Sequence, residues 1–192
     1  MLTTASASQV DDDPLPAGAR NVSGNEPLAA GYALESFVGV APGALDPDPA
    51  AFVAAMEGSA ASQSFAAAAG STLTFKWDLS TLEASRDPAV ADIAFVVVDG
   101  RLATLATSLA ATTPFSGGDY LSHTGWMDYA TTLTTGGTHT LAFGVADVGQ
   151  FTDTSALWVT DVAVSGVPES PTIALMAAGL GLLGLRARRR RR

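Results

Sequence analysis

The stretch Thr72-Leu73-Thr74-Phe75-Lys76-Trp77-Asp78-Leu79 decides the fold class. Apolar and polar side chains alternate through it without a break, so that every second residue from Leu73 to Leu79 is apolar. A period of two is the period of a β-strand, because successive side chains point to opposite faces of a sheet. We therefore predict an antiparallel strand that is buried on one face only.

Strand patterns continue outward from this stretch. Residues 93–98 are almost wholly apolar and β-branched, and Asp99-Gly100 supplies a type I′ turn into residues 101–107, which predicts a hairpin. The other predicted strands are 126–133 and 138–145, joined by a turn at Gly136-Gly137, the closing strand 156–164 and a weaker strand at 59–69. Two short helices are predicted, at 34–40 and from Asp48-Pro49 to Met56.

These segments predict an all-β fold. We expect a jelly roll or β-sandwich of seven to eight strands with one or two short helices, plus a C-terminal hydrophobic helix. The chain divides into a signal-peptide remnant (1–7), a flexible acidic leader (8–31), a β-sandwich domain (32–166) and a sorting tail (167–192).

Charge is distributed unevenly along the chain, which has a formal net charge of −9 and no cysteine. Residues 1–166 contain four basic and eighteen acidic side chains, whereas residues 167–192 contain six arginines and one glutamate. An acidic body repels a phosphate backbone, so we expect no nucleic-acid partner. The absence of cysteine excludes thiolate nucleophiles and Cys-ligated metals.

The tail consists of a short polar segment, an apolar run and a terminal arginine cluster. The 15 residues from Pro171 to Leu185 would span roughly 22 Å as a helix, against about 30 Å for the hydrocarbon core of a bilayer. The arginines would flank this anchor on the cytoplasmic side: Arg186, Arg188, Arg189, Arg190, Arg191 and Arg192. This order predicts a sorting tail, with a plain C-terminal membrane anchor as the alternative, and either one places the body on the exported side.

The polar segment carries a family resemblance. Val167, Pro168, Glu169, Thr172, Ala174 and Leu175, followed by the Gly/Leu/Ala run and the arginines, resemble the PEP-CTERM sorting signal of Gram-negative bacteria. The resemblance implies processing by exosortase, a membrane-embedded cysteine-peptidase-like enzyme, near the Pro-Glu-Pro. It also implies anchoring in the inner membrane during sorting, and then release to the cell surface or the extracellular space. The corresponding motif here is Val167, Pro168, Glu169, Ser170, Pro171 and Thr172, in which Ser170 and Pro171 reverse the usual order.

The first residues fit the same route. Ala5-Ser6-Ala7 matches an A-x-A cleavage site and is followed by the acidic run Asp11–Asp13. We interpret 1–7 as the end of a signal peptide that starts further upstream. The alternative is a chance match in an Ala/Ser-rich stretch.

The body carries a second resemblance. The segments that carry it are 33–39, 57–60, 69–77, 94–96, 141–148 and 155–159. They resemble the jelly-roll domain of PEP-CTERM proteins, and the closing strand is similar to the last strand of galactose-binding-like carbohydrate modules, which implies a structural Ca²⁺ held in part by Asp161. Glu57, Asp147 and Asp161 supply the hard oxygen ligands that Ca²⁺ prefers. Alternatively, Asp161 faces solvent or pairs with Lys76 or Arg101.

Candidate ligand-binding residues are few, and no catalytic motif is present. Trp77 belongs to the predicted core face, whereas Trp126 and Trp158 are candidates for stacking on the apolar face of a pyranose, with ordinary packing as the alternative. A His-dependent hydrolase would have to use His123, and His139 is expected to be an exposed structural residue.

We therefore expect a non-enzymatic exported surface or matrix protein, which the resemblance associates with exopolysaccharide and biofilm. The alternative is a carbohydrate-binding module that recognises the exopolysaccharide. A hydrolase on the same scaffold is the third class.

Overall fold

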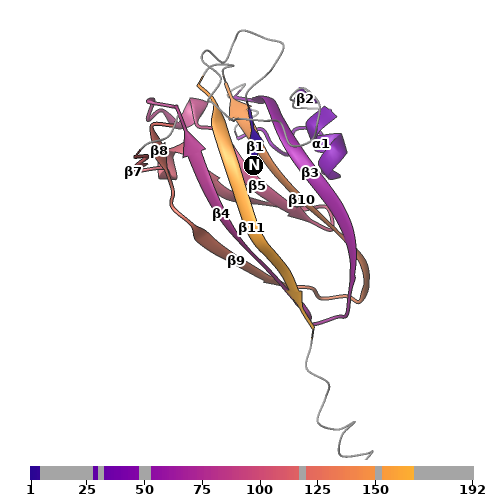
Figure 1. Ribbon diagram of the computed structural model, residues 1–192. Helices are drawn as coiled ribbons and strands as arrows, with labels where there is room; N and C mark the ends of the chain where they lie inside the picture. The colour runs from indigo at the N-terminus through magenta and orange to yellow at the C-terminus, as the bar shows by residue number, and fades with distance from the viewer. Residues whose placement is uncertain (5–27, 30–32, 48–52, 117–119, 150–152, 167–192) are drawn as a thin grey trace, which may run out of the picture.

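The computed structural model of the chain describes residues 1–4, 28–29, 33–47, 53–116, 120–149 and 153–166. These residues form two antiparallel sheets that face each other, which confirms the predicted β-sandwich (Figure 1). The elements in chain order are β1 (Leu2–Thr3), β2 (Leu28–Ala29), α1 (Ala33–Val38), β3 (Ala55–Ala67), β4 (Thr72–Thr81), the 3₁₀ turn η2 (Pro88–Val90), β5 (Ile93–Val98), β6 (Arg101–Thr107), the 3₁₀ turn η3 (Ser108–Ala110), β7 (Thr113–Pro114), β8 (Ser122–His123), β9 (Met127–Thr132), β10 (Gly137–Val148) and β11 (Ser155–Ser165).

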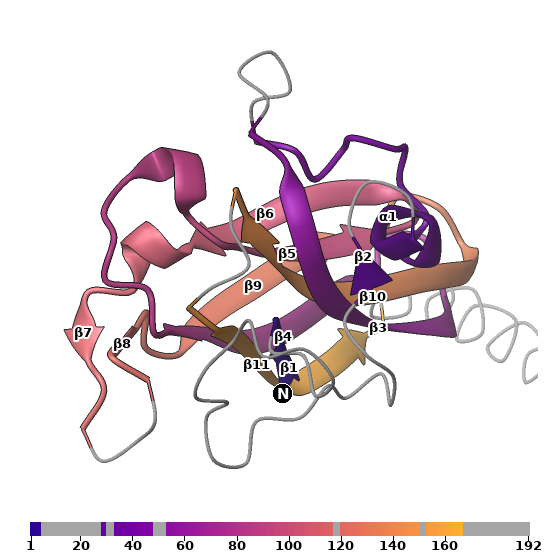
Figure 2. The same ribbon diagram turned by 90° about the horizontal axis from the view of Figure 1, so that it is seen from above.

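Each sheet is built around one pair of long strands. In the first sheet, here called sheet A, β4 pairs with β11 on one side and with β8 and β9 on the other, while β1 lies outside β11 and β7 outside β8. In the second, sheet B, the order is β2-β3-β10-β5-β6. Figure 2, which looks down on the sandwich, shows α1 beside β2 and β3 on the side of sheet B.

The inner face of β4 forms the centre of the core between the sheets. Its four apolar side chains, Leu73, Phe75, Trp77 and Leu79, are at most 6% exposed, as the alternation predicts. The Phe75 ring stacks on Tyr129 of β9 with centroids 4.6 Å apart and meets the edge of Phe143 of β10 at 4.8 Å. One aromatic side chain of sheet A therefore contacts both its own sheet and the opposite one.

Sheet B is buried on both faces, which explains why the sequence of β5 is apolar throughout. Ala94 and Val96 point into the core shared with sheet A, whereas Phe95 and Val97 pack in a second cluster with Leu34 of α1. Phe95 lies directly over its cross-strand partner Gly144, where a Cβ atom would approach the ring to 2.1 Å. Glycine is therefore required at position 144 by the close packing of Phe95.

Several strand predictions are confirmed. The 93–107 hairpin forms as β5 and β6, and its turn has φ of 51° at Asp99 and 74° at Gly100, as a type I′ turn requires. The closing strand is β11, and the weaker strand at 59–69 is part of β3.

The predicted pairing of 126–133 with 138–145 is wrong. Both strands exist, but β9 pairs with β4 in sheet A and β10 pairs with β3 and β5 in sheet B. The turn at Gly136-Gly137 therefore crosses from one sheet to the other. Glycines permit a reversal of the chain, but they do not determine which strand lies beside the returning one.

Two further predictions differ from the structure in part. The first helix is confirmed as α1, but the predicted second helix is contradicted at Ala55 and Met56, which belong to β3, while 48–52 lie outside the described residues. The sandwich also extends beyond 32–166, because β1 and β2 precede residue 32. Short strands of two residues have no periodicity by which a sequence could reveal them.

β1 ties the two sheets together. Leu2 and Thr3 pair with Leu157 and Ala156 of β11. Ser59 of β3 accepts a hydrogen bond from the Thr3 N–H at 3.0 Å and donates one to the Thr3 carbonyl at 2.5 Å. Residues of the predicted signal-peptide remnant therefore contribute a buried strand to the described sandwich.

The first prediction tests the inner face of β4. Phe75→Ala should lower the free energy of unfolding by about 3 to 5 kcal/mol, because it removes a buried ring and leaves a cavity. Lys76→Ala is the neighbouring control on the outer face, and its cost should be within about 0.5 kcal/mol. Urea denaturation of both variants measures the difference, and equal losses would show that the inward face is misassigned.

A second prediction tests β1. Leu2→Ala in the 192-residue chain should cost about 2 to 5 kcal/mol, since the Leu2 side chain is only 3% exposed. Thermal and urea melts check it against wild type. If residues 1–7 lie outside the folded domain, the substitution will leave both melts unchanged.

Candidate functional site

The candidate site lies on the outer face of sheet A, where β4 runs between β11 and the segment formed by β8 and β9. Two residues of β4, Lys76 and Asp78, belong to the face opposite the core. Asp78 pairs in register with Trp158 of β11, and Lys76 pairs with Asp128 of β9. Polar residues of the central strand are therefore bordered by an aromatic residue and by a charged one.

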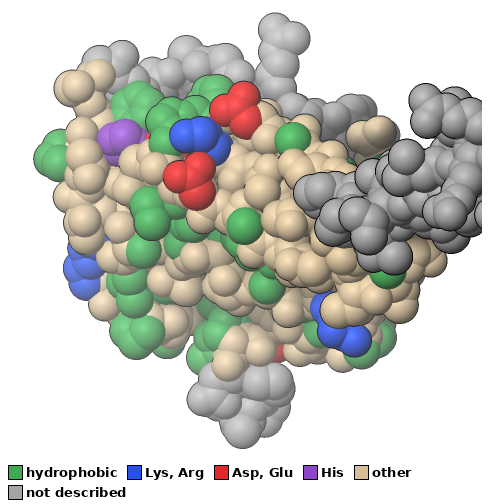
Figure 3. All heavy atoms as spheres, turned by 90° about the horizontal axis from the view of Figure 1, so that it is seen from below, with side chains coloured by type: hydrophobic (Ala, Val, Ile, Leu, Met, Phe, Trp, Pro, Cys, Tyr) green, Lys and Arg blue, Asp and Glu red, His purple; other side chains and the backbone are tan. Residues whose placement is uncertain are grey.

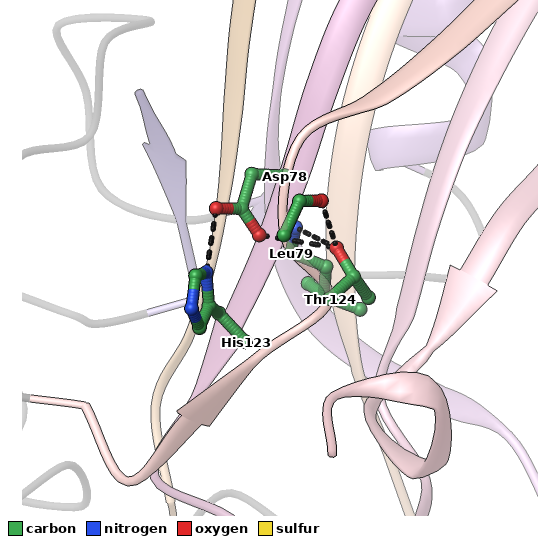
Figure 4. A network of polar contacts seen from close by, with 5 residues as sticks. Asp78, Leu79, His123 and Thr124 are labelled. Carbon is green, nitrogen blue, oxygen red and sulfur yellow. Dashed lines mark hydrogen bonds and ion pairs between the residues drawn. The ribbon is translucent and has the colours of Figure 1, made fainter. Parts of the chain in front are cut away.

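A hydrogen-bond network holds Asp78 in place (Figure 4). Its Oδ2 lies 2.8 Å from Nδ1 of His123, and its Oδ1 accepts a hydrogen bond from the Thr124 hydroxyl at 3.0 Å. The Asp78 side chain is 7% exposed and the His123 side chain 23% exposed. The carboxylate is therefore satisfied by protein groups, while the imidazole keeps access to solvent.

The local sequence explains why this network forms. Gly125 has a positive φ of 75°, and between β8 and β9 the chain has one more residue than β4 has opposite it. The resulting bulge interrupts the ladder of backbone hydrogen bonds. Thr124 satisfies the backbone groups of Leu79 there: the Thr124 N–H donates to the Leu79 carbonyl at 2.9 Å, and the Thr124 hydroxyl accepts from the Leu79 N–H at 3.0 Å. The same hydroxyl then reaches Asp78.

The three tryptophans divide as the sequence predicts. Trp77 is 6% exposed in the core, whereas Trp126 is 54% and Trp158 36% exposed. Trp126 lies in the bulge immediately before β9, and Trp158 pairs in register with Asp78 on the outer face, so the two exposed indoles border β4 on opposite sides. Since the two lie on opposite sides of β4, their backbones are about 10 Å apart, which is two strand spacings.

Exposed hydrophobic side chains are concentrated near these tryptophans. Among the described residues, the large hydrophobic side chains that are exposed lie on β11 or in the segment 121–127, with the exception of Phe37. They are Leu121, Trp126, Met127, Trp158, Val162 and Val164. Met127 and Val164 pair in register with the inward residues Trp77 and Leu73, so they belong to the other face of sheet A, at its margins. On the outer face, the exposed aromatic side chains are those of Trp126 and Trp158.

Charge on this face is low and locally balanced. Lys76 Nζ lies 3.5 Å from Asp128 Oδ1 in an exposed pair, which contributes little to stability. The end of the sandwich that is seen from below also has few charged side chains, with hydrophobic ones interspersed among uncharged groups (Figure 3). The face therefore suits a neutral, hydroxyl-rich ligand better than a polyanion.

Two of the three predicted calcium ligands lie on paired strands: Glu57 on β3 and Asp147 on β10 are buried next to the register pair Gly58–Ala146. Asp161 is exposed in the bulge of β11, with φ of 55°. It therefore faces solvent, as the alternative predicts, and Lys76 pairs with Asp128. Within the described ranges, no three or more His, Cys, Asp or Glu side chains are placed to hold a metal ion.

A group of buried carboxyls brings Asp147, a predicted calcium ligand, together with Asp92 and Glu83, which the sequence did not single out. Asp92 and Asp147 are at most 1% exposed and hydrogen-bonded to each other, and Glu83, 4% exposed, accepts a hydrogen bond from the Ser108 hydroxyl. Asp92 also accepts from the Ser155 hydroxyl at 2.5 Å and from the Val148 N–H at 3.3 Å. The available sequence signal was an Asp within an apolar run, at 91–93 and at 146–148.

Burial favours the protonated form of the Asp92 and Glu83 carboxyls. Loss of solvation, with a smaller contribution from the neighbouring Glu83, outweighs the opposing hydrogen bonds from Asp147 and Ser155, and the net effect raises the pKa of Asp92 to about 7. Burial likewise raises the pKa of Glu83, against the hydrogen bond from Ser108. The hydrogen bond that Asp92 accepts from Asp147 favours the ionised form of Asp92, so the two carboxyls share one buried site by holding a proton between them.

The sorting residues lie outside the described residues. These are the motif Val167–Thr172, the apolar run and the arginine cluster from Arg186 to Arg192. Within the described part of the chain, no helix is long and apolar enough to cross a membrane. The Asp78 network was not predicted, since Asp78 and His123 are 45 residues apart and meet only through the β4–β8 register.

Comparison with known proteins adds no assignment: no family model matches this sequence, and no curated protein matches it.

A third prediction concerns pH. The folded state holds a proton on Asp92 that the unfolded state releases between the ordinary pKa of 3.8 and about 7, so this group should make the free energy of unfolding fall as pH rises across that window. Asp92→Asn replaces the carboxyl by an amide, which can still hydrogen-bond to Asp147 but does not ionise. The stability of the wild type should therefore fall relative to that of the variant from pH 4 to pH 7. Urea melts at fixed pH values measure it.

Asp128→Asn is the matched control, because it removes an exposed carboxylate. Its stability difference from wild type should not follow the same pH course. The melts are repeated in EDTA, which should change nothing. A pH effect of Asp92→Asn that appears only after chelation would mean that a bound cation keeps these carboxyls ionised, contrary to the proton-sharing account.

Proposed function

We propose that this chain is a non-enzymatic, exported surface or matrix protein whose sandwich binds polysaccharide through the outer face of sheet A. The observation that carries the proposal is the pair of exposed tryptophans on either side of the Asp78–His123–Thr124 network. A flat indole offers apolar area to the C–H face of a pyranose, and adjacent polar groups fix the orientation of its hydroxyls. His123, part-exposed and anchored by Asp78, supplies such a polar group.

The spacing of the two tryptophans supports a chain rather than a single sugar. The backbones of Trp126 and Trp158 are about 10 Å apart, which is more than the width of one sugar ring. Consecutive units of a polysaccharide would therefore occupy the two indoles. The Lys76–Asp128 pair adds hydrogen-bonding groups beside them without adding net charge. This combines the two expectations from the sequence, with carbohydrate recognition as the means by which the matrix protein acts.

The strand order supports a jelly roll as the finer description of the sandwich. The principal strands, numbered one to eight in chain order, are β1, β3, β4, β5, β6, β9, β10 and β11. In sheet A the spatial order is β1-β11-β4-β9, which are strands one, eight, three and six. In sheet B it is β3-β10-β5-β6, which are strands two, seven, four and five. This interleaving is what two wound Greek keys produce, and jelly rolls with it occur among lectin domains.

The sorting route remains part of the proposal. The order of Val167–Thr172, the apolar run and the terminal arginines in the sequence supports processing by an exosortase-like enzyme and export in a Gram-negative bacterium. The membrane and the processing enzyme would then be transient partners, and exopolysaccharide the lasting one. Terminal mass spectrometry of the protein from its native host tests this part: retention of the arginine cluster in the mature protein would contradict it.

A hydrolytic role for His123 has little support. A carboxylate bonded to an imidazole is the orienting half of a catalytic triad, but a hydrolase also needs a nucleophile on the other nitrogen. Among the described residues, no Ser or Thr hydroxyl is hydrogen-bonded to His123. The pair therefore serves better as a rigid polar group for binding.

The fourth prediction tests this face by affinity electrophoresis and calorimetry with a panel of neutral polysaccharides. Trp126→Ala and Trp158→Ala should each weaken binding roughly tenfold or more, since about 1.4 kcal/mol of lost contact corresponds to that factor. Phe37→Ala is the control, because it removes an exposed aromatic side chain from α1, away from sheet A. Binding that survives both tryptophan substitutions, or that Phe37→Ala also abolishes, would contradict the proposal.

A further inference from the structure

A pocket of about 360 Å³ lies where the free edges of the two sheets meet. β6 is the last strand of sheet B, and β9 pairs only with β4, so each presents an unpaired edge there. The walls come from the β5–β6 turn and the start of β6 on one side, and from the end of β9 and the loop after it on the other. Neither Trp126 nor Trp158 is among the residues that line it.

The pocket is lined by one cation, Arg101, by one carboxylate, Asp99, and by many hydroxyls. Arg101 lies at its rim, Tyr129 and Thr131 supply hydroxyls together with further threonines of 132–135, and Leu102 and Leu133 supply apolar area. The ring of Tyr129 is fixed by its stacking on Phe75. Alternating hydroxyl and apolar groups of this kind match a sugar, which has polar edges and an apolar face.

Arg101 is available for a ligand. Among the described basic side chains, Lys76 pairs with Asp128 and Arg86 donates to the Leu109 carbonyl. Arg101 forms no ion pair or side-chain hydrogen bond with a described residue, and the lowering of the Asp99 pKa comes first from its hydrogen bond with His139 and least from its attraction to Arg101. A guanidinium presents a planar pair of donors that fits a carboxylate in a bidentate manner. In a body with eighteen acidic side chains, such a cation is an unusual feature.

The neighbouring carboxylate does not occupy Arg101. Asp99 Oδ2 lies 2.7 Å from Nδ1 of His139, and its Oδ1 accepts a hydrogen bond from the Thr140 N–H at 2.9 Å. His139 is only 2% exposed, so the expectation that it is an exposed residue is wrong: it is a buried anchor that holds the β5–β6 turn against β10. This anchoring fixes the backbone from which Arg101 projects and leaves its guanidinium to meet a ligand.

We propose that this pocket binds one uronic-acid unit, with Arg101 holding the carboxylate and the hydroxyl-bearing side chains of β9 and its following loop holding the sugar hydroxyls. A monoanion suits the site, because the lining carboxylate of Asp99 is bonded to His139 and to the Thr140 N–H, which leaves the Arg101 guanidinium to meet one ligand carboxylate. The acidic body repels ligands with several phosphates or sulfates. The volume is at the small end of ligand pockets, which favours a single sugar unit over a long segment.

The experiment is a titration of the full chain with D-glucuronate and D-galacturonate, followed by calorimetry and by ¹H–¹⁵N NMR. D-Glucose tests the need for the carboxylate, and acetate tests the need for the sugar. At least one uronate should bind at millimolar concentration or below, with shifts at Arg101 and at 131–135. Both controls should bind at least tenfold more weakly.

Arg101→Gln should weaken uronate binding at least tenfold, and Arg101→Lys should restore only part of it, because lysine lacks the planar fork. Arg86→Gln is the matched control, since it changes the net charge equally and should leave binding intact. The Trp126→Ala/Trp158→Ala double variant should also bind the uronate normally, so failure of this proposal and failure of the Trp face are distinguished. No uronate binding, equal binding of acetate, or indifference to Arg101→Gln would overturn the proposal.

Discussion

The alternation of side chains along β4 is the constraint on which the rest of the molecule depends. Its inner residues pack against sheet B through Phe75 and its neighbours, so the register of β4 cannot slip by one residue without moving the whole apolar set to solvent. That same register fixes the outer residues, and it places Asp78 beside Trp158 on one edge and within reach of His123 on the other. Stability and the candidate binding face are therefore two sides of one strand.

The two sheets differ in how much of their surface is buried. Sheet B is packed between sheet A and the cluster around α1, and its strands are accordingly apolar on both faces, as in β5. Sheet A has its outer face open to solvent, and the exposed tryptophans lie there. The carboxyls of Asp92 and Asp147 are hydrogen-bonded where β10, β11 and the chain before β5 come together, so protons rather than basic side chains balance their charge.

Sequence patterns predicted correctly those elements whose structure depends on a few neighbouring residues. The period of two identified β4, and the Asp99-Gly100 turn identified the hairpin, because both signals are contained within a few residues. The partners of β9 and β10 depend on packing between distant segments, and β1 is too short to have a pattern at all. The exposure of Trp126 and Trp158 followed from alternation, whereas the contact of Asp78 with His123 requires a register that no local pattern encodes. The exposure of Asp161 could not be decided from the sequence, because a bulge reverses the face that simple alternation gives it.

The most direct test of the central claim follows all three indole N–H resonances during one NMR titration with a bound polysaccharide fragment. If β4 separates a core face from a binding face, Trp126 and Trp158 will shift on addition of ligand, while Trp77, on the inner face, keeps its resonance and its protection from hydrogen exchange. A ligand-dependent shift confined to Trp77, or shifts in none of the three despite binding, would contradict the account.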